Sequence, residues 1–99
     1  MELLIKALRQ QAPPLNSRQD GEDPPVPCRI VIPGCSWAWY PLEFDGHNLC
    51  YGFVDGDFPE FGSFRLTELQ EAARLYRTAP QLDPSFTPCR VSHLLGTVR

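Results

Sequence analysis

The sequence lacks the features that most directly assign a chemistry. The closest pair among its four cysteines is Cys28 and Cys35, so the C-x₂-C spacing typical of zinc sites is absent. No apolar run approaches the roughly 18 residues of a membrane span. Charges interrupt the short apolar start MELLIKALRQQ, which argues against a signal peptide. We therefore expect a cytoplasmic protein with reduced thiols, no metal and no cofactor.

The chain also lacks an excess of positive charge. Nine Lys and Arg residues stand against twelve Asp and Glu, which gives a net charge of −3. Proteins that hold nucleic acid usually carry a basic face, so this balance argues against direct nucleic-acid binding. Apolar residues make up 42% of the chain and charged ones 21%, as in an ordinary folded domain. At 99 residues the chain forms a single domain, 1–99, with little room for a deep cofactor cavity.

Aromatic residues are concentrated between residues 30 and 66. This stretch holds both tryptophans, two of the three tyrosines and five of the six phenylalanines. Turn signals at Pro33-Gly34 and Asp45-Gly46 divide it, and Asp55-Gly56 opens a further loop. The pattern predicts an antiparallel meander of about four strands. The predicted strands cover 28–32, 37–44 (or from 36), 49–54 and 61–66.

The expected strand register places apolar side chains on both faces of this sheet. Pairing of Ile32 with Trp37 sets Ile30 opposite Trp39 on one face. Pairing of Phe44 with Leu49 sets Leu42 opposite Tyr51, and Tyr40 opposite Phe53, on the other face. A sheet in water usually keeps one polar face, so both faces of this one need a cover.

Two helices flank the predicted meander. Residues 2–11 place Leu3, Leu4, Ala7 and Leu8 on one stripe, and Pro13-Pro14 ends that helix. The second helix begins at a predicted N-cap, Thr67, and ends near 78–80. Residues 14–27 are expected to form a surface loop, and 80–99 an irregular tail with a short strand or turn around 88–95. The fold class is therefore α+β, with both helices packed on one face of the sheet.

Acidic and aromatic side chains supply the candidate binding surface. Asp55, Asp57 and Glu60 form an acidic loop, which we expect to lie beside Glu43 and Asp45. Exposed aromatics next to such a loop are typical of protein-binding surfaces. The alternative is a solvated turn in which Asp and Gly supply the backbone angles. The candidate partner-binding residues are Asp55, Asp57, Glu60, Glu43, Asp45, Phe58, Tyr40 and Tyr51; no catalytic or metal-ligating residue is assigned.

Three motifs are similar to those of an uncharacterised bacterial family of plasmids and phages, domain of unknown function 2958. They are L-x-x-A-L-R-x-Q-x-P-P-L, S-W-A-W-Y-P-L-E-F-D, and C-Y-G-F-V-D-G-D-F-P-E-F-G-S-F-R-L-T-E-L. The resemblance ends near Tyr76. The residues that carry it are Trp37, Trp39, Tyr40, Gly52, Phe53, Glu60, Gly62, Phe64, Leu66, Glu68 and Leu69. It implies no activity, only a setting among mobile elements, where small acidic proteins such as anti-CRISPR proteins often block host defence.

The sequence and this resemblance together favour a non-enzymatic protein-binding module from a mobile genetic element. The expected partner is a host protein or ribonucleoprotein complex with a basic surface, and the expected outcome is anti-CRISPR-type inhibition of a nucleic-acid-targeting defence complex. No membrane association is expected, and a homodimer is left open. Two alternatives remain: a small hydrolase or metal-dependent enzyme that uses the Asp55, Asp57 and Glu60 loop, or a nucleic-acid-binding accessory protein that uses Arg29, Arg65, Arg74 and Arg77.

Overall fold

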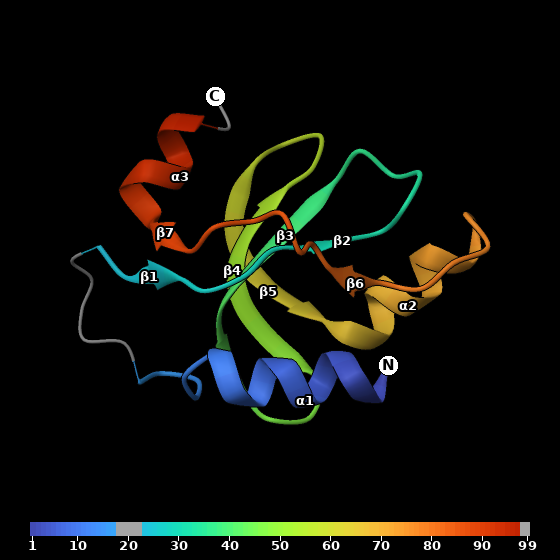
Figure 1. Cartoon of the computed structure of the whole chain (residues 1–99), viewed down its shortest axis with the longest axis horizontal. Coiled ribbons are helices and arrows are strands. Elements are labelled where there is room, and N and C mark those ends of the chain that lie inside the picture. Colours follow the sequence, from blue (N-terminus) through green and yellow to red (C-terminus); the bar gives the residue numbers. More distant parts are fainter. Residues whose placement is uncertain (18–22, 98–99) are drawn as a thin grey trace.

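The aromatic stretch forms the centre of one antiparallel sheet. In the computed structural model, which describes residues 1–17 and 23–97, the strand order is β5-β4-β3-β2-β6 (Figure 1). The first four are the expected meander, and β6 adds to the free edge of β2. The strand bounds are β2 Ile30–Val31, β3 Ala38–Phe44, β4 Leu49–Asp55, β5 Glu60–Arg65 and β6 Gln81–Leu82.

The predicted register is confirmed at two pairs and displaced at two others. Ile30 lies opposite Trp39, and Tyr40 lies opposite Phe53. Phe44, however, pairs with Cys50 rather than Leu49, and Tyr51 pairs with Glu43 rather than Leu42, because the register shifts between Pro41 and Glu43. A β-bulge at this point inserts one extra residue into β3.

A glycine on the neighbouring strand permits the close approach beside this bulge. Pro41 lies opposite Gly52. A Cβ atom on Gly52 would lie 2.1 Å from the carbonyl oxygen of Tyr40, so no side chain fits there. An isolated glycine inside a strand pattern is the sequence signal for such a contact.

Two helices cover the first face of the sheet, as predicted. Helix α1 (Glu2–Gln11) contributes Leu4 and Leu8, and helix α2 (Leu66–Arg74) contributes Leu66, Leu69 and Ala73. These side chains form one buried cluster with sheet residues Cys28, Ile30, Ile32, Trp39, Phe44, Cys50 and Phe64. An amphipathic helix this short depends on such packing for its stability.

The start of α2 differs from the prediction that Thr67 is its N-cap. The N-cap is Arg65, two residues earlier, and the backbone N–H of Thr67 donates to the side chain of Asn48 at 3.0 Å. The backbone N–H of Leu66 donates to the Asn48 carbonyl at 2.9 Å. Asn48 lies in the β3–β4 turn, so a residue remote in sequence satisfies the free donors of the first turn.

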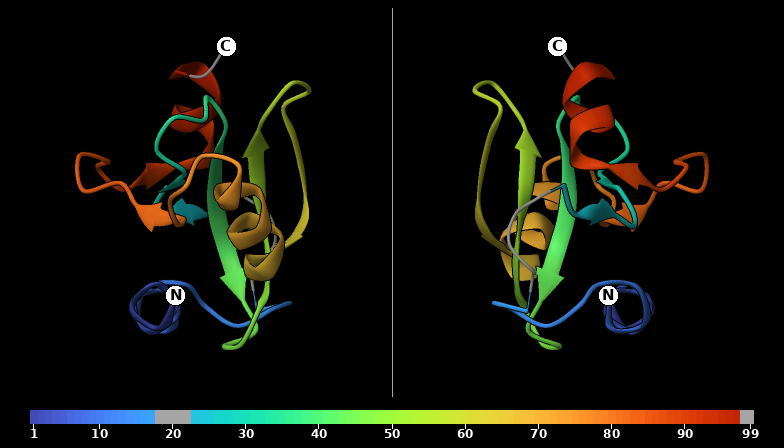
Figure 2. Two further views of the ribbon diagram at one scale, coloured as in Figure 1. Left: turned by 90° about the vertical axis from the view of Figure 1, so that its right-hand side faces the viewer. Right: turned by 90° about the vertical axis from the view of Figure 1, so that its left-hand side faces the viewer.

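The C-terminal segment, expected to be an irregular tail, covers the second face of the sheet. It contains β6, strand β7 (Cys89–Arg90) and helix α3 (Val91–Thr97). Strand β7 pairs with β1 (Pro25–Val26), which lies inside the expected loop 14–27. The core of this face consists of Val26, Tyr40, Leu42, Phe53 and Leu94. Figure 2 shows α2 and α3 on opposite sides of the sheet.

Polar contacts fix this segment to the rest of the chain. The Asp23 carboxylate accepts hydrogen bonds from the backbone and the hydroxyl of Ser92, at 2.8 and 2.7 Å, at the start of α3. Arg29 forms an ion pair with Asp83. The Arg29 guanidinium also lies 5.1 Å from the ring centre of Phe86 and 5.9 Å from that of Tyr40. Sequence reasoning had not paired these residues, because they are remote in sequence.

Candidate functional site

The acidic loop and one tryptophan meet at one end of the sheet. Strand β4 ends at Asp55 and β5 begins at Glu60, so the segment between them is a hairpin tip. Ala38, the first residue of β3, pairs with Asp55, which brings Trp37 beside this tip. We call residues 37 and 55–60 the acidic tip.

Trp37 rests against the backbone of the acidic tip. A Cβ atom on Gly56 would lie 2.7–2.8 Å from carbon atoms of the Trp37 ring, so the indole occupies the space that a side chain would need. Trp37 is 36% exposed, and its ring centre lies 6.1 Å from that of the buried Trp39. The sequence analysis had not assigned Trp37 to the site; its proximity depends on the Ala38–Asp55 pairing.

The charges of the acidic tip have no partner within the described part of the chain. Asp57 and Glu60 are exposed and Asp55 is half-buried. None of the three takes part in an ion pair among residues 1–17 and 23–97. Phe58, between them, is 83% exposed. A large apolar ring held in water among uncompensated carboxylates is typical of a contact surface for a basic protein.

Two residues that the sequence analysis placed on this surface are buried, which is a correction. Tyr40 packs against Phe53 and Phe86, with ring centres 6.1 and 5.8 Å away, and it is 2% exposed. Glu43 is 3% exposed, and its Oε1 accepts a hydrogen bond of 2.8 Å from the backbone N–H of Asn16. Both therefore support the fold rather than contact a partner.

Asp45 and Tyr51 also lie away from the acidic tip. Asp45 precedes β4 and Asp55 ends it, so the strand separates them by about 20 Å at roughly 3.3 Å per residue. The Asp45 carboxylate accepts hydrogen bonds from the backbone N–H groups of residues 47, 48 and 49. Bonding to Asn48, the largest of these effects, lowers the pKa of Asp45. Tyr51 is half-buried within β4 and packs against the core of the second face.

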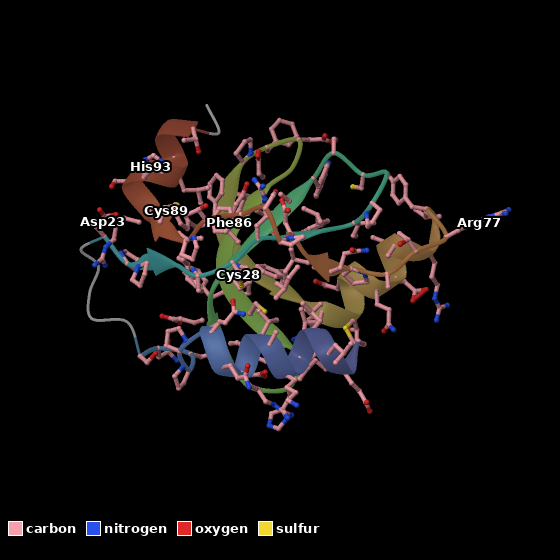
Figure 3. All side chains as sticks on the ribbon, viewed as in Figure 1. Asp23, Cys28, Arg77, Phe86, Cys89 and His93 are labelled. Atoms are coloured by element: carbon pink, nitrogen blue, oxygen red, sulfur yellow. The ribbon has the colours of Figure 1, made fainter. Side chains whose placement is uncertain are left out.

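The positions of the cysteines and histidines do not support a catalytic or metal-binding site. All four cysteines are free, and burial raises the pKa of Cys28 and of Cys50 to about 12, which disfavours the reactive thiolate. Cys89 lies beside α3, whereas Cys28 lies near the centre of the sheet (Figure 3). His47 and His93 are exposed. In the described ranges no three His, Cys, Asp or Glu residues are placed to hold a metal ion.

The arginines proposed for nucleic-acid binding are divided between the two faces of the sheet. Arg29 pairs with Asp83 beside the second face of the sheet. Arg74 and Arg77 lie at the far end of α2, which covers the first face, and Arg77 points away from the protein (Figure 3). Arg74 also pairs with Glu71 at 3.5 Å. A phosphate backbone would need several cations along one track.

One apolar groove lies where α1, β1 and the segment before β7 supply its lining. This groove of about 380 Å³ is lined by Gln11 and four prolines, Pro13, Pro25, Pro27 and Pro88. It contains no nucleophile, acid or base. None of the helices in the described part of the chain is long and apolar enough to span a membrane.

Comparison with known proteins returns no relative. No family model, no curated protein and no solved structure matches this chain.

Proposed function

We propose that this protein is a non-enzymatic binding module whose acidic tip docks on the basic surface of another protein. One observation carries the proposal: Phe58 is 83% exposed and lies between carboxylates that have no ion-pair partner in the described residues. An exposed ring supplies contact area, and the charges steer the encounter with Lys or Arg on the partner. Negative charge at the tip repels phosphate, so a protein is the better ligand.

The concrete form of the proposal is inhibition of a host ribonucleoprotein that targets nucleic acid, as anti-CRISPR proteins do. Its support is the acidic tip; the setting among mobile elements is an expectation taken from the sequence motifs, and no family model matches them. Such complexes present basic grooves for nucleic acid, which a compact anionic surface can occupy. Within the described residues no three His, Cys, Asp or Glu side chains are placed to hold a metal ion, so the metal-dependent alternative gains no support there.

A charge-reversal pair with a matched control tests the acidic tip. Asp55→Lys with Asp57→Lys changes the net charge by the same amount as Glu2→Lys with Glu71→Lys, at exposed positions on α1 and α2. We expect purified CRISPR ribonucleoprotein effectors, with their target DNA, to lose DNA binding when the wild type or the control is added. The tip variant should be at least about tenfold weaker.

The salt dependence of this inhibition separates steering by charge from unspecific effects. Wild-type inhibition should weaken as salt rises from about 0.05 to 0.5 M, because exposed charges are screened. Phe58→Ser should weaken inhibition without changing that salt dependence, since it removes contact area and no charge. Equal activity of the tip variant and the control would refute the proposal for the acidic tip.

A further inference from the structure

The outer edge of β5 is open. Strand β5 pairs with β4 on one side, and it lies at the margin of the sheet in both views of Figure 2 with no described segment beyond it. It has no proline and its pairing with β4 shows no bulge, the devices that usually protect edge strands. Its charges are confined to its two ends, Glu60 and Arg65.

Alternate residues of β5 direct their backbone groups toward this edge. The backbone N–H of Arg65 donates to the Glu68 carboxylate at 3.0 Å, so it is not turned toward its β4 neighbour, Leu49. Backbone groups alternate in direction along an antiparallel strand. Ser63 and Phe61 therefore also present their N–H and C=O groups outward.

The side chains of the same residues lie on the second face of the sheet. Phe61 contacts Phe53 of that face, with ring centres 5.1 Å apart, yet Phe61 is 41% exposed. Ser63 and Arg65 are exposed as well. Helix α3 thus shelters Phe53 but leaves the β5 side of this face uncovered. A strand added at the edge would extend the sheet and cover Phe61.

Symmetry restricts how two copies of β5 can pair. A two-fold axis perpendicular to the sheet keeps each face on its own side, and directly opposed residues share a face. One residue must therefore oppose its own copy. Ser63 fits, because its N–H and C=O groups point outward and can form a reciprocal pair of hydrogen bonds.

This register is also complementary in charge and shape. Phe61 then lies opposite Arg65 of the second copy, and the cation–π contact occurs twice. The Glu60 end of each strand meets the Arg65 end of the other, and the two acidic tips lie at opposite ends. Phe64 of the second copy faces Gly62, where a Cβ atom would have no neighbour within 4 Å.

We propose that this protein forms a two-fold dimer in which two β5 strands pair antiparallel around Ser63. The result is one continuous sheet through both copies. A strand-to-strand contact buries less than the roughly 1,600 Å² of a standard stable interface, so the dimer dissociates on dilution. The acidic tip keeps Asp57 and Phe58 uncovered, and the inference does not depend on the proposed function.

Sedimentation velocity at rising protein concentration tests the dimer. The wild-type mass should rise from 11.2 kDa toward twice that value between about 10 μM and 1 mM. Ser63→Pro removes an outward N–H that is turned away from β4 and has no partner among the described residues, so the variant should keep its fold and remain monomeric. Ser63→Thr retains the N–H and should dimerise like the wild type. A wild type that stays monomeric throughout, or a dimer unaffected by Ser63→Pro, overturns the proposal.

Cross-linking tests the register even if Ser63→Pro fails to fold. Residues that form a reciprocally bonded pair have Cα atoms about 5.5 Å apart, which suits a disulfide. Ser63→Cys should therefore form a covalent dimer under mild oxidation, beyond the background of the four native cysteines in the wild type. A cysteine at Gln70, exposed on α2, should not. Equal cross-linking at both positions contradicts the Ser63 register.

Discussion

Strand β4 is bounded by an Asp-Gly pair at each end, Asp45-Gly46 before it and Asp55-Gly56 after it. At the first, several polar groups are hydrogen-bonded within the protein. The Asp45 carboxylate accepts three backbone N–H groups, and the Gly46 carbonyl accepts a hydrogen bond of 2.8 Å from Arg9. Asn48 of the same turn caps α2. This turn joins α1, the sheet and α2.

The second pair lies in the acidic tip. No Lys or Arg in the described residues forms an ion pair with Asp55 or Asp57. Trp37 covers Gly56, and Phe58 projects into solvent. The same dipeptide is therefore structural where neighbouring backbone donors converge on it, and it forms a surface where none do. Which case applies is a property of the surroundings.

The largest expected difference between the two ends of β4 is in how much their aspartates contribute to the free energy of unfolding. Asp45→Ala leaves three backbone donors of the turn without their acceptor and should lower the free energy of unfolding by about 2 kcal/mol. Asp57→Ala should change it by less than about 0.5 kcal/mol. Urea denaturation of both variants measures the two values. Similar losses would mean that the acidic tip is as structural as the first turn.

Replacement by alanine should be unfavourable at both glycines, Gly46 and Gly56, but for different reasons. Gly46 has a φ of +89° and open space around its Cβ position, so Gly46→Ala should cost about 1 kcal/mol through backbone strain alone. In Gly56→Ala the new methyl group should push the Trp37 ring outward and raise its quenching by acrylamide. Gly46→Ala should leave that quenching as in the wild type. If Gly56→Ala left the quenching unchanged or lowered it, Trp37 would not pack against Gly56.

The smallest expected effect is a loss of stability at acidic pH. Hydrogen bonding to Asn48 keeps the pKa of Asp45 in the folded protein below its ordinary 3.8. The stability that this adds is present above that value and is lost as the pH falls through the lower folded value. The amide signals of His47, Asn48 and Leu49 should therefore titrate with a midpoint below 3.8. The titration should vanish in Asp45→Asn, and a midpoint above the ordinary value would contradict this origin.

Asp83 should also contribute to the loss of stability at acidic pH. Hydrogen bonds from Ser85 and then Arg29 lower its pKa to about 2. Its contribution is therefore present above pH 3.8 and is lost between that pH and about 2.

Much of the first face could be read from the sequence. Helical spacing over residues 2–11, ended by Pro13-Pro14, predicts α1 with the bounds observed. Aromatic-rich segments divided by turn signals predict the meander, including the Tyr40–Phe53 pair. The displaced Phe44 pair follows from the β-bulge, whose sequence signals, Pro41 within the strand and Gly52 opposite, had not been used.

The candidate site was predictable only in part. Asp55, Asp57, Glu60 and Phe58 are close in sequence, so one hairpin tip holds them together. Asp45 was misplaced because the turn that holds it precedes β4, whereas the acidic tip follows β4 at the other end of the strand. Glu43 was misplaced because its hydrogen bond comes from Asn16, 27 positions away. Tyr40 was misplaced because the local pattern does not reveal that the second face receives a cover. Here that cover comes from α3, which is too short for a strong periodic signal.

By itself, the sequence determined the local elements: a proline-terminated helix, four strands divided by Gly-containing turns, and a second amphipathic helix. These depend on neighbours within a few residues, where backbone preference and side-chain periodicity act. Only the tertiary structure decided which charges are used internally and what covers the second face. The contacts responsible join Arg29 to Asp83, 54 positions away, and Asp23 to Ser92, 69 positions away. Hydrogen bonding and packing at such separations depend on the folded geometry, which no local pattern records.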